Sequence, residues 1–136
     1  MVCAWMKADR PLAAICHGVV LAARSIDSET NNSILFGRKT TALLQSQELT
    51  AWWLTRAWLG SYYRTYPQTV QQEVLAALAS PEDFDNGPVA AWRDTEARPG
   101  FCVRDGNYVS ARWPGDVYGF VATFKTVLAE YSKPPT

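Results

Sequence analysis

The sequence is poor in the residues that build metal sites and disulfide frameworks. Its 136 residues include one histidine and three cysteines, Cys3, Cys16 and Cys102, and no two cysteines are spaced as C-x-x-C. A structural zinc site needs several convergent cysteine or histidine ligands, so we expect no metal, and no other cofactor is expected either. An odd number of cysteines argues against a disulfide framework and suits a reducing compartment.

The sequence also lacks an excess of either charge. Thirteen basic and thirteen acidic residues give a formal net charge of zero, and no run of one sign stands out. A nucleic-acid-binding surface or a patch for acidic membranes needs such an excess. The start of the sequence has no signal-peptide pattern, and no apolar run reaches membrane-spanning length. We therefore expect a soluble cytoplasmic protein without nucleic-acid or membrane partners.

The sequence does contain the apolar material for one core. Hydrophobic residues make up 48% of the 136 positions, and six of them are tryptophans. A chain of this length forms one domain at most. We expect that domain over residues 1–131, followed by a disordered tail over residues 132–136.

Residues 12–18 hold the most informative pattern. A short apolar run ends at Cys16, His17 and Gly18 follow, and a small-residue run over 19–24 favours a helix. This order is typical of a buried strand of a parallel α/β sheet that turns into a helix. Cys16 would then sit in the strand-to-helix turn, as in a nucleophile elbow, where the positive end of the helix favours the thiolate.

Hydrophobic periodicity, capping residues and turn residues predict the remaining elements. The first half of the chain is expected to form a helix over 2–7, a short strand over 34–36 that Gly37 stops, an extended piece over 39–41, and a helix over 47–59 with Ser46 as N-cap. The next helix opens with a capping box at 69–72 and ends at Pro81. A hairpin over 101–111 that turns at Asp105 and Gly106 and a helix over 117–131 with one apolar stripe complete the chain. The helix over 47–59 is apolar nearly all round, which either burial within the domain or a subunit interface would explain.

The run Ala-Ala-Ile-Cys-His-Gly at residues 13–18 resembles the nucleophile elbow of the ThiJ/PfpI family, in the class I glutamine amidotransferase-like superfamily. The resemblance continues through residues 35–41, 104–108 and 110–115. It implies an α/β fold, a flavodoxin-like three-layer sandwich with a mostly parallel sheet. Residues 1–131 would form only the C-terminal part of such a domain. The N-terminal elements are then missing, and the strand before Cys16 is left with an unpaired edge.

The resemblance also implies roles for five residues. Cys16 would be the nucleophile and His17 the general base, with the backbone N–H groups of His17 and Gly18 stabilising an oxyanion. Gly18 would also permit close packing at the elbow, and Arg112 and Pro114 would lie at the pocket rim. Purely structural roles also stay open for these residues: a buried cysteine that acts as a small hydrophobe, a surface histidine that only tunes charge, and a plain strand-to-helix turn over 112–115.

The acidic partner of the cysteine has no counterpart in this sequence. Family members typically place an acidic residue beside the cysteine from an earlier turn and draw one oxyanion-hole N–H from the same earlier half. Some also carry a histidine just after the Thr-Thr pair, where Ala42 stands here. Glu29 and Glu48 are available carboxylates, but no pattern aims them at Cys16. Cys3 and Cys102 are interpreted as structural.

The residues and the resemblance together leave three functional hypotheses. The first is a cysteine-nucleophile enzyme acting on small carbonyl or amide substrates, including peptides, either glyoxalase- or deglycase-like or peptidase- or amidase-like. The second is a non-enzymatic stress protein that senses redox state through an oxidisable thiol or acts as a chaperone. The third is an inactive fragment. The resemblance further implies a homodimer or a higher homo-oligomer.

Overall fold

The computed structural model describes residues 1–62, 66–89, 95 and 97–132. Its elements in chain order are α1 (Val2–Lys7), β1 (Leu12–Ile15), α2 (Gly18–Ala23), α3 (Gln45–Leu59), α4 (Val70–Ala77), the 3-10 turn η1 (Pro81–Asp83), β2 (Cys102–Asp105), β3 (Tyr108–Ala111), the 3-10 turn η2 (Pro114–Asp116) and α5 (Val117–Tyr131). None of the helices in this described part is both long enough and apolar enough to cross a membrane.

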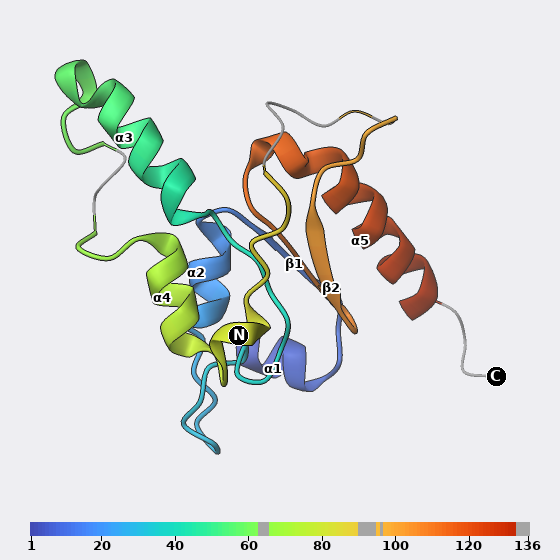
Figure 1. The fold of residues 1–136 in the computed structure, drawn as a ribbon. Helices are drawn as coiled ribbons and strands as arrows, with labels where there is room; N and C mark the ends of the chain where they lie inside the picture. Colours follow the sequence, from blue (N-terminus) through green and yellow to red (C-terminus); the bar gives the residue numbers. More distant parts are fainter. Residues whose placement is uncertain (63–65, 90–94, 96, 133–136) are drawn as a thin grey trace.

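The three strands form one sheet in the order β1-β3-β2. β1 runs parallel to β3, with Leu12 opposite Tyr108, and β2 runs antiparallel to β3. Gly106, at a φ of +58°, makes the tight turn of the β2–β3 hairpin possible. Helix α5 packs on β2 and β3, whereas α2 contacts β1 and α4 on the other side (Figure 1). The predicted α/β class, with helices on both faces of the sheet, is confirmed.

The main core lies between the sheet and the helices α2 and α4. The residues that fill it are apolar and nearly inaccessible to solvent, among them Ala14, Val19, Ala22, Ala23, Leu35, Val70, Val74 and Tyr108. Helix α4 opens as predicted, because the Thr69 hydroxyl accepts the Gln72 N–H and the Gln72 side chain accepts the Thr69 N–H. The same helix thereby presents Val70 and Val74 to the core.

A buried hydroxyl network ties residues 40–41 to β3. The Thr41 N–H donates to Ser110 Oγ at 2.9 Å, and Thr40 Oγ1 lies 3.0 Å from the Tyr108 hydroxyl. Thr40 also forms an isolated parallel bridge with Phe84, which agrees with the extended piece predicted over 39–41. The three side chains of this network, those of Thr40, Tyr108 and Ser110, are fully buried, so each hydrogen bond compensates for lost hydration.

Residues 34–36 do not form the predicted strand. They lie in successive turns, in which the Phe36 N–H donates to the Ser33 carbonyl at 2.9 Å and the Arg38 N–H to the Leu35 carbonyl at 3.0 Å. The Ser33 hydroxyl accepts the Leu35 N–H. Local turn bonds therefore satisfy the backbone that a sheet ladder would otherwise use.

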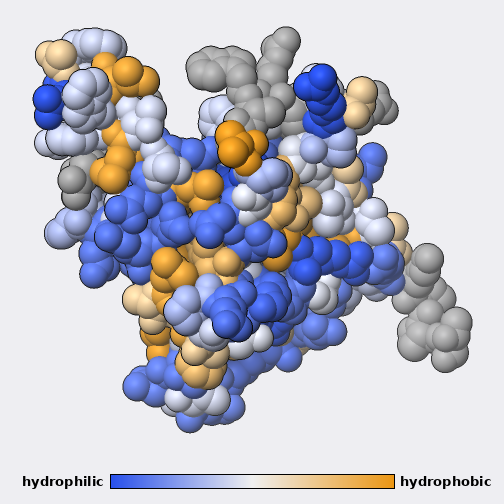
Figure 2. Space-filling view, viewed as in Figure 1, coloured by the Kyte–Doolittle hydropathy of each residue, from blue (hydrophilic) through white to orange (hydrophobic). Residues whose placement is uncertain are grey.

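The two longest helices expose more apolar surface than their sequence patterns predict. Helix α3 begins at Gln45, after Leu44 as N-cap, so Ser46 lies inside the helix. Trp53, Leu54 and Trp58 are 65%, 61% and 72% exposed, and α3 projects away from the sheet (Figures 1 and 2). Burial within the described part of the chain does not explain this apolar helix.

Helix α5 shows the same difference along its predicted stripe. Val127 is buried, whereas Val117, Val121 and Leu128 are all more than 40% exposed. The packing of α5 on β2 and β3 therefore covers only part of the apolar stripe. The exposed remainder is apolar surface that is available to another polypeptide.

Replacing Ser110 tests the hydroxyl network. The Ser110→Ala variant removes the acceptor of the buried Thr41 N–H, and we expect it to lower the free energy of unfolding by about 1–3 kcal/mol. Urea unfolding followed by tryptophan fluorescence measures the change. The control is Ser25→Ala, because the exposed Ser25 hydroxyl donates only to the Leu21 carbonyl and a change within about 0.5 kcal/mol is expected there. Equal effects of the two substitutions would contradict the assignment.

Candidate functional site

Cys16 occupies a sharp turn between β1 and α2. Its N–H donates to the Ala111 carbonyl at 3.0 Å, which is the last hydrogen bond between β1 and β3. Its φ is +58°, a left-handed value that residues with a Cβ adopt at a steric cost. Asp9 and Asn31 also have positive φ, but their side chains favour this region. A cysteine held there matches the strand-to-helix turn predicted from the sequence.

The thiol of Cys16 lies against the imidazole of the next residue. Cys16 Sγ is 3.3 Å from His17 Nδ1, and the His17 side chain is exposed to solvent. His17 precedes the first residue of α2, Gly18. A Cβ added at Gly18 would meet no atom within 4 Å. Among the described residues, packing around this position does not by itself require a glycine, and the role expected of Gly18 at the elbow stays a prediction.

The surroundings of Cys16 favour the neutral thiol. Burial raises the pKa of the Cys16 thiol above its usual value, and the negative charge of Glu48 adds to the increase, while a hydrogen bond from the His17 backbone N–H lowers it. The predicted preference for the thiolate is therefore not found in this part of the chain. Helix α2 has only six residues, so its dipole offers little to offset the burial.

Glu48 is a site residue that the sequence did not reveal. It lies in the first turn of α3 and is 6% exposed, and its Oε2 accepts the Val70 N–H at the start of α4 at 2.9 Å. The positive end of α4 stabilises a carboxylate at this place. Folding thus fixes a charged group near Cys16. An acidic residue in a first helical turn is common, so no sequence signal indicates that the charge of this one acts on the Cys16 thiol.

Arg112 belongs to a buried ion pair. It is 2% exposed, and its Nε and Nη2 donate to the two carboxylate oxygens of Asp116 at 2.8 and 3.0 Å. Its Nη1 donates to the carbonyls of Asn86 and Pro88, so the guanidinium also fixes that loop. Pro114 begins η2 between the two charged residues. Among the contacts of the described residues, none joins Arg112 or Pro114 to Cys16.

The two other cysteines have partners of their own. Cys3 Sγ donates to the Ile26 carbonyl at 3.2 Å, and Cys102 Sγ lies 3.3 Å from the Thr123 hydroxyl on α5. All three thiols are free. Within the ranges that the structure describes, no three His, Cys, Asp or Glu side chains converge as a metal site would require.

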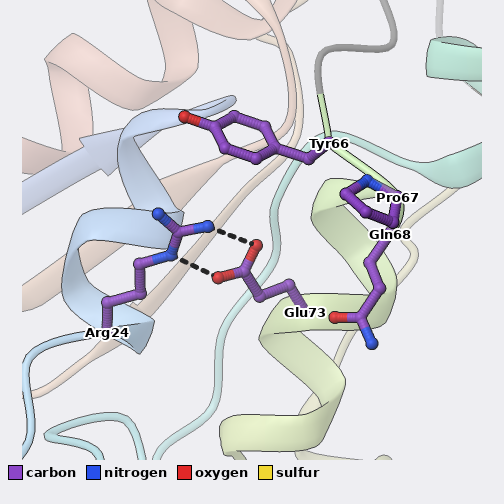
Figure 3. A pocket seen from close by; sticks show the side chains of 5 residues that line it. All are labelled: Arg24, Tyr66, Pro67, Gln68 and Glu73. Carbon is purple, nitrogen blue, oxygen red and sulfur yellow. Dashed lines mark hydrogen bonds and ion pairs between the residues drawn. The ribbon is translucent and has the colours of Figure 1, made fainter.

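A surface cavity beside α2 and α4 does not include the elbow. It has a volume of about 270 Å³ and is lined by Arg24, Tyr66, Pro67, Gln68 and Glu73 (Figure 3). Arg24 and Glu73 form a two-pronged ion pair across it, and the Tyr66 ring lies 5.2 Å from the guanidinium. Because the charged groups satisfy each other, this arrangement joins the two helices and offers no free charge to a ligand.

Comparison with known proteins supports the fold. No family model and no curated protein matches the sequence. Among solved structures, the Rapid Encystment Protein 24 kDa of Francisella tularensis superposes with a TM-score of 0.68 at 17% identity, over 93% of this chain and 47% of its own. Glyoxalase III of Candida albicans superposes with a TM-score of 0.55 at 21% identity, over 88% of this chain and 42% of its own.

A third solved structure, which bears only a target designation, superposes with a TM-score of 0.67 at 20% identity. The superposition covers 94% of the present chain and 48% of the chain in that structure. The chain thus spans a little under half of each of these structures. Over that span it has their mixed α/β fold.

The influence of Glu48 on the thiol can be measured directly. Because a carboxylate raises the pKa of Cys16, we expect Glu48→Gln to lower it, so that the pH midpoint of iodoacetamide alkylation at Cys16 moves to lower pH. Mass spectrometry resolves the three cysteines, and glutamine keeps an acceptor for Val70. The control is Glu29→Gln, which removes an exposed carboxylate paired with Lys7. An equal shift in both variants, or none at Glu48, would contradict the assignment.

Proposed function

We propose that Cys16 is the nucleophile of a ThiJ/PfpI-like activity on small carbonyl or amide compounds. The observation that carries the proposal is the left-handed Cys16 between β1 and α2, with its Sγ 3.3 Å from His17 Nδ1. A backbone strained at one reactive residue is a common feature of functional sites. A nucleophile within hydrogen-bonding reach of a base is the arrangement that covalent catalysis requires.

The raised pKa of the Cys16 thiol sets the order of events at this site. Because the resting sulfur carries its proton, His17 accepts that proton as the sulfur attacks the carbonyl carbon. A bond forms between sulfur and carbon, and the electron pair of the C=O bond moves to oxygen. In this proposal, backbone N–H groups of the elbow, that of His17 among them, would stabilise the oxyanion. His17 can then return the proton to the oxygen, which completes a reversible addition.

A small aldehyde is the first substrate class to test. One of the solved structures with this fold is named as a glyoxalase, which favours an aldehyde over an amide. Methylglyoxal is a suitable probe because its aldehyde carbon is an unhindered electrophile.

We further propose that the active form is a homo-oligomer in a reducing, cytoplasmic compartment.

Substitution of the nucleophile provides the decisive test of this activity. We expect Cys16→Ala to abolish methylglyoxal consumption and the formation of a methylglyoxal adduct at position 16, while the circular dichroism spectrum is unchanged. Cys102→Ala is the matched control, because Cys102 is also half-buried but lies at the α5 interface. Full activity in the Cys16 variant would refute the proposal. Loss of activity in both variants would point to a folding defect instead.

A chaperone-like role is the second candidate, and one observation favours it. The exposed side chains of Trp53, Leu54 and Trp58 make α3 an apolar surface of the kind that captures unfolded chains. The redox-sensing alternative draws less support, because burial raises the pKa of the Cys16 thiol and oxidation proceeds through the thiolate.

The chaperone-like role predicts dependence on α3 and not on the elbow. We expect the double variant Leu54→Gln, Trp58→Gln to lose most of any ability to prevent thermal aggregation of a model client such as citrate synthase. Cys16→Ala should retain that ability in full. Light scattering at a series of chain-to-client ratios makes the comparison. Equal protection by the α3 variant and the wild type would contradict this role.

A further inference from the structure

The starts of α3 and α4 hold each other by hydrogen bonds. The Gln45 N–H, at the first residue of α3, donates at 2.8 Å to Oε1 of Gln71, which lies in the first turn of α4. In return, the Val70 N–H at the start of α4 donates to Glu48 Oε2 at 2.9 Å. The first N–H groups of a helix have no acceptor within the helix itself. Each of these two helices therefore supplies an acceptor that the other lacks.

These bonds matter because few side chains of α3 are buried. Among its 15 residues, Glu48 is the only one that is buried within the described part of the chain. Further along the helix, Trp53 and Trp58 are largely exposed, and the helix projects away from the sheet (Figure 1). Packing of an apolar face normally holds a helix in place, so α3 depends instead on the bonds at its first turn. The place of the Glu48 carboxylate depends on the same bonds.

The amide of Gln71 makes a second bond that leads to the elbow. Its Nε2 donates to Asn86 Oδ1 at 2.8 Å, and the Asn86 carbonyl accepts a bond from Arg112 Nη1 at 3.2 Å. Arg112 follows Ala111, whose carbonyl accepts the Cys16 N–H. One side chain therefore ties the first turn of α3 to the framework that holds Cys16.

We propose that Gln71 is a positioning residue, which tunes the Cys16 thiol by fixing where α3 holds the Glu48 carboxylate. The negative charge of Glu48 raises the pKa of the thiol. Because the interaction between charges weakens with distance, a carboxylate on a loosened helix raises that pKa less. The inference rests on the proposed function in taking Cys16 as the reacting group.

The other charged groups packed around the elbow are not held by Gln71. The His17 imidazole contacts the sulfur from the turn itself. The remaining charges on α2, on α4 and after β3 are paired with each other, Arg24 with Glu73 and Arg112 with Asp116. Among these described groups, Glu48 is the one on the helix that Gln71 holds, so its position is the one that a change at Gln71 affects most directly.

The pH dependence of alkylation at Cys16 tests the inference. We expect Gln71→Ala to move the midpoint of iodoacetamide labelling to lower pH, as in Glu48→Gln, and to make labelling at neutral pH about two- to threefold faster. Gln68→Ala is the matched control, because it removes the same side chain from an exposed position that makes no hydrogen bond with the described residues. Its midpoint should equal that of the wild type. No shift in Gln71→Ala, or an equal shift in both variants, overturns the inference.

Failure of the proposed function has a different signature. Labelling with iodoacetamide requires no substrate, so the shift in Gln71→Ala is expected even if the wild-type chain consumes no methylglyoxal. Conversely, if Cys16→Ala abolishes activity but Gln71→Ala leaves the midpoint unchanged, only the role of Gln71 is refuted.

A double variant separates positioning from a general loosening of the fold. If Gln71 acts through Glu48, Gln71→Ala should cause no further shift in a Glu48→Gln background, since effects that share one path do not add. An undiminished shift in that background overturns the inference, because the loss of Gln71 would then act through the burial of the thiol. If Gln71→Ala does not fold, Asn86→Ala removes the acceptor of the same amide at an exposed position. It should shift the midpoint in the same direction, and an unchanged midpoint there overturns the inference.

Discussion

The hydrogen bond from the Cys16 N–H to the Ala111 carbonyl is the constraint on which the site depends. It ends the pairing of β1 with β3, and the left-handed φ of Cys16 then turns the chain directly into α2. The buried Arg112–Asp116 ion pair holds the other side of this junction, because Arg112 follows Ala111 and fixes both η2 and the loop over 86–88. The hydrogen bond between β1 and β3 therefore holds the elbow on one side, and the Arg112–Asp116 ion pair holds it on the other. The free energy of folding offsets the cost of its strained backbone.

The electrostatics of the elbow favour proton transfer during attack over a thiolate formed in advance. Burial and the Glu48 carboxylate both raise the pKa of Cys16, and the opposing influence is the His17 backbone N–H. The His17 imidazole is the group in contact with the sulfur. A neutral thiol resists oxidation, and in the proposed mechanism it would gain reactivity when the histidine accepts its proton. Glu48 has a separate structural reason for its position, since it caps α4.

Sequence reasoning succeeded where local chemistry decides the conformation. The apolar run before Cys16, the Asp105-Gly106 turn and the Thr69-Gln72 capping box each specify their element through nearby residues. It failed at residues 34–36, where Ser33 offers turn bonds in place of a ladder. It also could not show that the charge of Glu48 raises the pKa of Cys16 or that burial outweighs the short α2 dipole, because both depend on how distant segments pack. The hydrophobic periodicity of α3 shows that the helix is apolar, but it does not show which other segments the helix packs against. Its exposure could therefore not be predicted.

The role of His17 as the base beside a neutral thiol is tested most directly by the alkylation rate of Cys16 at neutral pH in the His17→Ala variant. Mass spectrometry would follow iodoacetamide labelling, with Cys3 and Cys102 in the same molecule as references. If the histidine accepts the proton of a neutral buried thiol, the rate at Cys16 falls about tenfold or more while the reference rates stay the same. An unchanged rate at Cys16 would contradict this role, because the thiol would then react without the base beside it.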